Sequence, residues 1–290
     1  MYNSRMININ AEENEKIKVF RELDNEFRFN QGDLKIKFQD DPDSEPVVYS
    51  VHKDVMKANS GYWKNLLESE LDMTEGMDPF RFEREPFRNL LELLYKGKCA
   101  IYEAKIPEFL RLLDYFSFKE VLNTAYAQTL PHISESNVLK LFLQFNSSIL
   151  VNNANKEKVR DYMLENFGIV HKHTLFYLFR EEHVLDLIKN DRININEKDL
   201  IDVLIRYSNN FHSHMELPID SEERAKVLER LLKYVRFQHI DAEYIKSHFT
   251  VIKVLHRPAI QALKDIAVNA KTLSYQELPT EMRGPKRESY

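Results

Sequence analysis

Apolar residues recur along the first part of the chain with two different periods. Between residues 17 and 27 they are spaced three or four apart, which predicts an amphipathic helix. Residues 34–38 alternate apolar with charged positions and predict a half-buried strand, and the β-branched and aromatic residues of 47–51 predict a second strand. Because the acidic, turn-forming stretch 40–46 joins these two runs, we expect them to form a hairpin.

Helical periods dominate the chain after this hairpin. A short helix is expected around Val55 and Met56, interrupted by Asn59-Ser60-Gly61, and Ser60 can cap a second short helix that carries Tyr62, Trp63, Leu66 and Leu67. A longer helix from Phe87 is expected to end at Gly97. In the second half, stripes of apolar residues predict an array of antiparallel helices. These stripes are Val138, Leu141, Phe142 and Phe145; then Val184, Leu187 and Ile188; then Leu200, Val203, Leu204 and Tyr207.

The amino-acid composition excludes several classes of protein and several kinds of binding partner. Only 6 of the 290 residues are glycine, which argues against phosphate-binding glycine loops and most all-β architectures. The formal net charge of −5 gives no basic surface for nucleic acid or for an anionic membrane. The N-terminus lacks the apolar stretch of a secretory signal, and no run of about 18 apolar residues could span a bilayer. We therefore expect a cytoplasmic or nuclear protein that binds neither nucleic acid nor membrane.

No motif of enzymatic or metal chemistry is recognisable. The pairs His171/His173 and His212/His214 are spaced so that each pair would converge only on a strand, and no third ligand with a matching spacing occurs. The chain has no glycine-rich phosphate loop, nucleophile elbow or HExxH zinc helix. We expect a protein with no catalytic residues, metal or cofactor.

The one cysteine, Cys99, leaves two interpretations open. It excludes an internal disulfide and a multi-cysteine zinc site. Lys96 and Lys98 lie beside it and could lower the pKa of its thiol, which would make it a redox-sensitive group. The other interpretation is a buried, inert thiol.

The order of predicted elements in the first half resembles a BTB/POZ domain. The family pattern is an Asp before the first strand, a His followed by an apolar helix, and then Ser-x-Tyr-Phe. Trp63 stands where the family usually has Phe. The resemblance spans residues 15–127 and implies an α+β fold with a small sheet flanked by helices. The residues that occupy the family positions are Asp33, His52, Ser60, Tyr62, Trp63, Tyr95 and Gly97.

The second half resembles the BACK domain that follows BTB in kelch-type proteins, which implies an all-α domain of antiparallel helices. The most specific string is LLKYVRF at residues 231–237, and Tyr207 stands where the family commonly has Trp. We therefore expect a flexible N-terminus (1–14), a BTB/POZ domain (15–127), a BACK domain (128–250), and a C-terminal helix with a polar tail (251–290). No kelch repeats occur in this chain, and the sequence leaves open whether a substrate domain was removed or never present.

The resemblance also implies a site. BTB domains of ubiquitin-ligase adaptors carry a hydrophobic-x-Glu element after their paired helices, and Met73-Thr74-Glu75 matches it, with Leu71 as an alternative apolar residue. Tyr62 and Leu66 of the preceding helix are expected to join this cullin-binding surface, and the helix pair of residues 133–167 would adjoin it. The alternative is a solvated acidic loop in which Met73 has no partner.

The first amphipathic helix has two possible roles. Its stripe could cover the chain's own core or, as in BTB homodimers, pack across a two-fold axis. The stripe consists of Ile17, Phe20, Leu23 and Phe27.

Together these features predict a dimeric adaptor of a cullin-3 RING ubiquitin ligase that recruits an unknown protein substrate. The alternative is a BTB-BACK oligomerisation scaffold or transcriptional co-regulator that binds no cullin.

Overall fold

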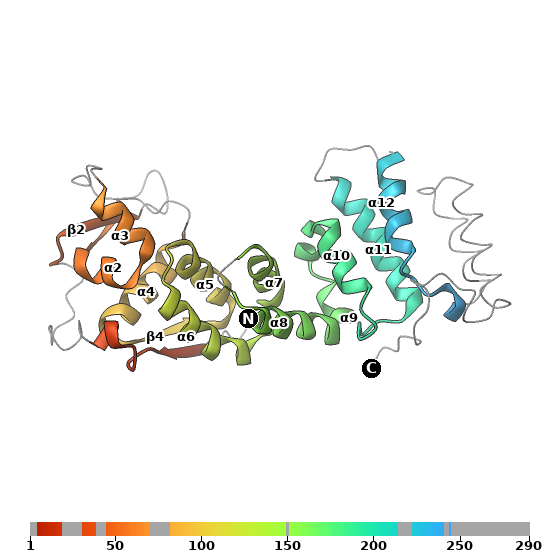
Figure 1. The fold of residues 1–290 in the computed structure, drawn as a ribbon. Helices are drawn as coiled ribbons and strands as arrows, with labels where there is room; N and C mark the ends of the chain where they lie inside the picture. Colours follow the sequence, from red (N-terminus) through yellow and green to blue (C-terminus); the bar gives the residue numbers. More distant parts are fainter. Residues whose placement is uncertain are drawn as a thin grey trace. The chain divides into compact units, whose positions relative to one another are not determined.

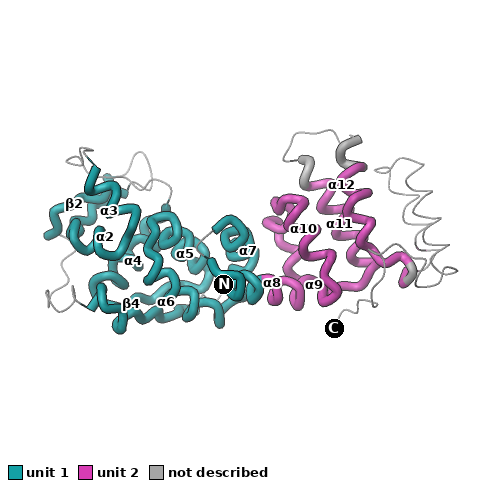
Figure 2. The backbone as a smooth tube through the Cα atoms, viewed as in Figure 1, with its two compact units in different colours: residues 1–159 teal, residues 160–290 magenta. Residues whose placement is uncertain are grey.

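The computed structural model describes residues 5–18, 31–38, 45–69, 82–148, 151–213, 222–240 and 244. The chain divides into two compact units, residues 1–159 and 160–290 (Figures 1 and 2). Each unit is described by itself.

The first unit contains two small antiparallel sheets. Strands β2 (Leu34–Phe38) and β3 (Val47–Val51) pair with Leu34 opposite Val51, which confirms the expected hairpin. Strand β1 (Met6–Asn10) pairs with β4 (Lys98–Tyr102). Residues 6–10 are therefore ordered by a strand partner far away in the sequence, where we expected a flexible N-terminus. The alternating residues Ile7 and Ile9 of β1 are buried, and this burial favours the ordered strand.

Helices surround these sheets. The longest, α4 (Arg84–Lys96), packs against β4 and against α5 (Ile106–Tyr115). Its leucines 90, 91, 93 and 94 are fully buried, so α4 forms the centre of this unit. Further helices in the described residues of the unit are α2 (Lys53–Asn59), α3 (Gly61–Glu68), α6 (Lys119–Thr129) and α7 (Val138–Ser147), with short 3₁₀ helices η1 (Glu103–Lys105) and η2 (Leu130–His132).

The end of α4 is set by Gly97. This residue is in the left-handed conformation with φ 76°, and its N–H donates to the carbonyl oxygen of Leu93. A side chain is disfavoured in this conformation, so glycine ends the helix as the sequence predicts. The chain then turns directly into β4, a strand that the sequence pattern did not predict.

The second unit is helical. Helix α8 (Asn153–Glu165) runs across the division between the units and leads into α9 (Phe167–Val170), η3 (Thr174–Leu178), α10 (Glu181–Ile188), α11 (Glu197–Ser213), α12 (Glu222–Leu232) and η4 (Phe237–His239). Helix α11 packs against both α12 and η3. All the apolar stripes predicted for the second half of the chain are buried, which confirms their helical period.

The string LLKYVRF owes its specific pattern to a buried charge. Leu231, Leu232, Val235 and Phe237 are buried, as is Arg236 between the last two. The Arg236 guanidinium pairs with the Asp191 carboxylate, and the Arg236 main-chain N–H donates to Glu197 Oε2 at 3.0 Å. The main-chain contact with the start of α11 needs no particular side chain, whereas the ion pair with Asp191, in the loop before α11, depends on the arginine side chain.

Tyr207 is accommodated in the core of the second unit. It is fully buried on α11, and its hydroxyl donates to the carbonyl oxygen of Phe179 at 2.7 Å. This hydrogen bond satisfies the polar atom that tyrosine brings to a position where the family commonly has Trp.

The C-terminal helix and tail expected over residues 251–290 lie outside the described residues. Within the part that the structure describes, no helix combines the length and the apolar character needed to cross a membrane.

Candidate protein-binding surface

Helix α3 carries Tyr62 and Leu66, the two predicted cullin-binding residues that the structure describes. Its start is fixed by Ser60, whose side-chain oxygen accepts a hydrogen bond from the Trp63 N–H at 3.0 Å. The Ser60 hydroxyl also donates to the carbonyl oxygen of Phe116. The predicted N-cap is thus confirmed, and the same side chain ties α3 to the end of α5.

Neighbouring aromatic residues of α3 have opposite roles. Trp63 is fully buried and stacks on Phe116, with ring centroids 5.5 Å apart. Tyr62 remains partly exposed and packs against Phe116 at 5.1 Å and Tyr115 at 5.9 Å. Tyr115 is itself 50% exposed. Trp63 therefore anchors the helix, and Tyr62 and Tyr115 form an aromatic surface beside it.

Phe82 extends this aromatic surface. Its ring lies 5.1 Å from that of Tyr115, and the Arg111 guanidinium lies 4.7 Å from the centre of the Phe82 ring. Such a cation–π contact attracts the guanidinium to the face of the ring and holds the two side chains together. We call Tyr62, Phe82, Arg111 and Tyr115 the aromatic surface of the first unit.

The predicted loop residues precede Phe82 of this surface in the sequence. Helix α3 ends at its C-cap Ser69, and the described chain resumes at Phe82. Leu71, Met73 and Glu75 fall between these points and lie outside the described residues. Leu66 lies one turn after Tyr62 on α3 and is partly exposed, so these two residues share a face of the helix.

A groove lies between α5 and α7 in the same unit. It has a volume of about 360 Å³ and is lined by residues that include Glu108, Arg111, Lys140 and Gln144. Glu108 and Lys140 form an ion pair at 2.6 Å that joins the two helices. Arg111 belongs to both the groove and the aromatic surface, so the two features are continuous.

The electrostatic state of the aromatic surface follows from its partial burial. Burial, followed by the nearby Tyr115, raises the pKa of the Tyr62 hydroxyl above its ordinary value. Tyr62 is therefore neutral at physiological pH and can donate or accept a hydrogen bond at the edge of an apolar contact. An apolar ring with a polar end is common among residues that anchor protein interfaces.

Sequence reasoning missed Phe82, Arg111 and Tyr115. One signal was available for Tyr115, because it interrupts the outer face of the amphipathic helix 106–115 with a large aromatic residue. Phe82 had no such signal, since its partners are distant in the sequence.

Asp33, His52 and Tyr95, which carry part of the family resemblance, stabilise the fold of the first unit and are not part of the aromatic surface. Asp33 Oδ1 accepts from the Lys53 N–H at 2.9 Å, at the first residue of α2. The His52 main-chain N–H donates to the Tyr95 hydroxyl at 2.8 Å, and His52 Nδ1 lies 3.1 Å from the same oxygen. These contacts fix the start of α2 against β2 and α4, and they explain why the pattern requires these residue types.

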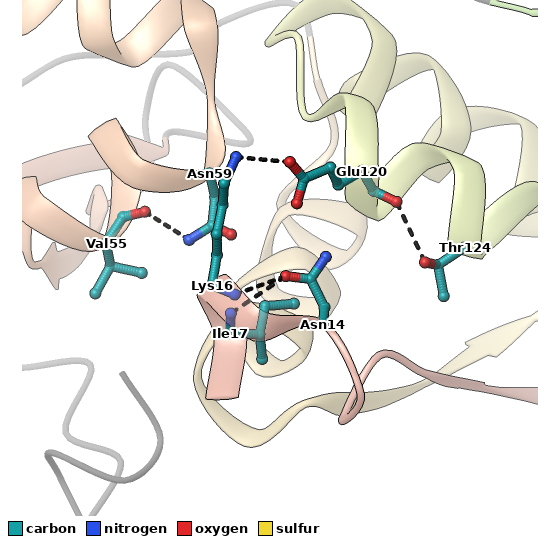
Figure 3. A network of polar contacts seen from close by, with 7 residues as sticks. All are labelled: Asn14, Lys16, Ile17, Val55, Asn59, Glu120 and Thr124. Atoms are coloured by element: carbon teal, nitrogen blue, oxygen red, sulfur yellow. Dashed lines mark hydrogen bonds and ion pairs between the residues drawn. The ribbon is translucent and has the colours of Figure 1, made fainter. Parts of the chain in front are cut away.

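The start of the predicted first helix is also held within its own unit. Asn14 Oδ1 accepts from the N–H groups of Lys16 and Ile17, at 3.1 and 3.3 Å, and Lys16 Nζ forms an ion pair with Glu120 of α6 at 2.7 Å (Figure 3). Ile17 is 0% exposed in the single chain, so its side chain belongs to the core of this chain. Phe20, Leu23 and Phe27, the other predicted dimer residues, lie outside the described residues.

The remaining chemical candidates were the histidine pairs and Cys99. His171 is buried and His173 exposed, while His212 is in the last turn of α11 and His214 lies outside the described residues. Across the described ranges, no three or more His, Cys, Asp or Glu residues are grouped so as to hold a metal ion. Burial and then Glu92 raise the pKa of the Cys99 thiol to about 12, which contradicts the interpretation of a lysine-activated thiol.

Comparison with protein families identifies two domains. The BTB/POZ domain model matches residues 28–134, and the BACK model, described as "BTB And C-terminal Kelch", matches residues 141–250.

Curated relatives are distant. Kelch-like protein 40 of Xenopus tropicalis is 20% identical over 205 residues, which cover 69% of this chain and 31% of that protein. Kelch-like protein 41 of Mus musculus is 19% identical over 206 residues, which cover 69% of this chain and 32% of that protein. The chain thus spans about a third of the length of these relatives.

Proposed function

This chain belongs to the BTB-BACK proteins, with distant similarity to kelch-like proteins, and from this premise we propose that it is a substrate-recruiting adaptor of a cullin-3 RING ubiquitin ligase. BTB and BACK domains are typically non-catalytic. The proposed role is accordingly one of proximity, in which a bound substrate is held near a ubiquitin-charged enzyme and its effective concentration there is raised.

The observation that carries the proposal is the aromatic surface of the first unit. Tyr62 and Tyr115 leave large rings partly exposed, and Tyr115 contacts Phe82, where the described chain resumes after the segment that contains Met73 and Glu75. Buried aromatic and arginine anchors dominate binding energy at protein interfaces, and a carboxylate such as Glu75 would fix the register of the partner. The groove between α5 and α7 offers a continuation of this contact surface.

The proposal includes a homodimer. Phe20, Leu23 and Phe27 would pack across a two-fold axis, which would place two adaptor arms in one complex and add avidity. Light scattering tests this part, because Phe20→Asp combined with Leu23→Asp is expected to give a monomer mass or insoluble protein. An unchanged dimer mass would contradict it.

The central experiment is titration calorimetry of the full chain against the N-terminal domain of cullin-3. We expect sub-micromolar binding with one cullin per protomer. If a folded dimer gives no heat and forms no complex, the alternative of a scaffold or co-regulator that binds no cullin replaces the adaptor proposal.

Two sets of variants locate the binding surface. Tyr62→Ala is expected to weaken cullin binding about tenfold or more, as is Met73→Ala combined with Glu75→Ala. Tyr177→Ala is the matched control, since Tyr177 is also a partly exposed tyrosine but belongs to η3 of the second unit. Equal affinities for Tyr62→Ala, the loop variant and the control would mean that cullin binds elsewhere.

A further inference from the structure

The second unit contains a pocket that the proposed function does not use. Its volume is about 370 Å³, and it is lined by Gly168 of α9, by His171 and Lys172 just after α9, and by Asp199 and Arg206 of α11. A Cβ atom at Gly168 would lie 3.6 Å from the Asn194 carbonyl oxygen, so the missing side chain leaves this space open. Pockets of this size can hold a small ligand or a single side chain with its neighbours.

The most unusual group in the pocket is His171. It is only 7% exposed, and its Nδ1 atom is buried without a hydrogen-bond partner among the described residues. The Phe167 ring lies 5.8 Å away on the same helical segment and offers no polar contact. Burying an imidazole without satisfying it is costly, and polar groups of this kind occur mainly where a ligand or function requires them.

The positively charged side chains that line the pocket with His171 also lack partners in the described part of the chain. The side chains of Lys172 and Arg206 are exposed and form no hydrogen bond or ion pair within the described part of the chain. Asp199, by contrast, already accepts a hydrogen bond from Asn196 Nδ2 at 2.7 Å. The groups left without partners are therefore positive or neutral, although the pocket also contains carboxylates.

The charged groups of the pocket are separated along α11. Asp199 and Arg206 are seven residues apart, which corresponds to about 10 Å along the helix axis at 1.5 Å per residue. Asp202 lies between them. Arg206 is therefore separated from the Asp199 carboxylate, while Asp202 lies one turn before Arg206 on the same helix.

The pKa of His171 depends on its burial and on the charged groups around its ring. Burial lowers the pKa of its imidazole, and Lys172 and Arg206 lower it further, against opposing contributions from its own main-chain carbonyl and from Asp199. The free protein thus holds a neutral ring in a positive field. A bound anion would reverse this field and favour the protonated ring.

We propose that this pocket binds a doubly charged oxyanion of the phosphate-monoester type, held between Lys172 and Arg206 with a hydrogen bond from the His171 ring. The planar guanidinium can donate two parallel hydrogen bonds to such an anion, and the ammonium adds a second charge. The anion could be a phosphorylated side chain of a protein segment or a free phosphate. This inference goes beyond the proposed function and does not depend on cullin binding.

The test follows the His171 ring by NMR in the full chain labelled with ¹³C at its histidines. The variant His171→Leu assigns its signal. The probes are phosphoserine blocked at both ends, inorganic phosphate, and acetate as a singly charged comparison. Both phosphate probes should move the His171 signal saturably and raise the midpoint of its pH titration, and acetate should bind more weakly. No movement of the His171 signal at millimolar concentrations of either phosphate probe overturns the proposal.

Charge variants separate a specific site from general attraction. Lys172→Gln combined with Arg206→Gln should weaken binding at least tenfold. Lys158→Gln combined with Arg180→Gln removes the same charge from exposed positions outside the pocket and should leave binding unchanged. Equal losses in both double variants would overturn the site. Several-fold tighter binding of blocked phosphoserine than of inorganic phosphate indicates a protein segment as the source of the anion, and equal binding indicates free phosphate.

Discussion

The two units differ in which side chains they expose and which they bury. In the first unit, Tyr62 and Tyr115 leave large aromatic rings at the surface. In the second, charged groups enter the core, where Arg236 is 2% and Glu197 3% exposed. Exposed rings cost little stability and remain available to a partner, whereas a buried arginine is committed to its own fold. Substitutions in the two regions should therefore fail in different ways, through binding in the first and through stability in the second.

The sharpest test compares two neighbouring residues of α3. Trp63→Ala should lower the free energy of unfolding of the first unit by about 3–5 kcal/mol, because it empties a fully buried site next to Phe116. Tyr62→Ala should cost much less, since its ring is partly exposed. Urea denaturation followed by circular dichroism measures both. Similar losses for the two variants would contradict the division of roles between anchor and surface.

A second test concerns the buried charge of the other unit. Arg236→Ala should destabilise the second unit by about 3 kcal/mol, at the low end for a broken buried pair, because Asp191 is 56% exposed and can be resolvated.

The matched control for Arg236 is Arg192→Ala. Arg192 pairs with Asp161 at the surface, where its side chain is 60% exposed, and its loss should cost at most about 1 kcal/mol. Hydrogen exchange of the α11 amides would report the difference locally. If Arg192→Ala costs as much as Arg236→Ala, burial is not the source of the effect.

The smallest expected effect concerns His171. Its side chain is buried like that of Arg236, but its Nδ1 atom has no hydrogen-bond partner among the described residues. His171→Leu should raise the stability of the second unit by about 1 kcal/mol at neutral pH, because it removes an unsatisfied polar group from a buried site. Thermal or urea unfolding at several pH values measures this change, and a loss of stability at neutral pH would contradict it.

The same variant should change the pH dependence of stability. The pKa of His171 is lowered in the folded state, so the unfolded state binds the proton more tightly. Protonation of His171 therefore favours the unfolded state. This effect is absent above the unfolded pKa of about 6.5, and the free energy of unfolding decreases as the pH falls from there toward the folded pKa. His171→Leu should reduce this loss, although His183, whose pKa is also lowered by burial, retains part of it. The exposed neighbour His173→Leu is the control, and an unchanged slope in His171→Leu would contradict the account.

The candidate surface shows how far sequence reasoning reached. The helix that carries Tyr62 and Leu66 was predicted because its N-cap, Ser60, is readable from local sequence, while the binding role of these two residues stays a prediction from the family resemblance. Phe82 and Arg111 were not found, because their contact joins segments from opposite sides of α4 in the sequence. The roles of Met73 and Glu75 remain a prediction from the family resemblance.

Features that depend on neighbours along the chain could be read from the sequence. Period-two alternation predicted β2, β-branched and aromatic residues predicted β3, helical spacing predicted the buried stripes of α7, α10 and α11, and Gly97 ended α4 where a left-handed residue was needed. Which distant segments meet became visible only in the folded chain. Strand β1 gains its order from β4, Arg236 gains its partners from the region of α11, and His171 forms a pocket with Arg206. Periodicity and capping are local, whereas strand partners, buried ion pairs and pockets depend on long-range packing that one sequence does not encode in any short window.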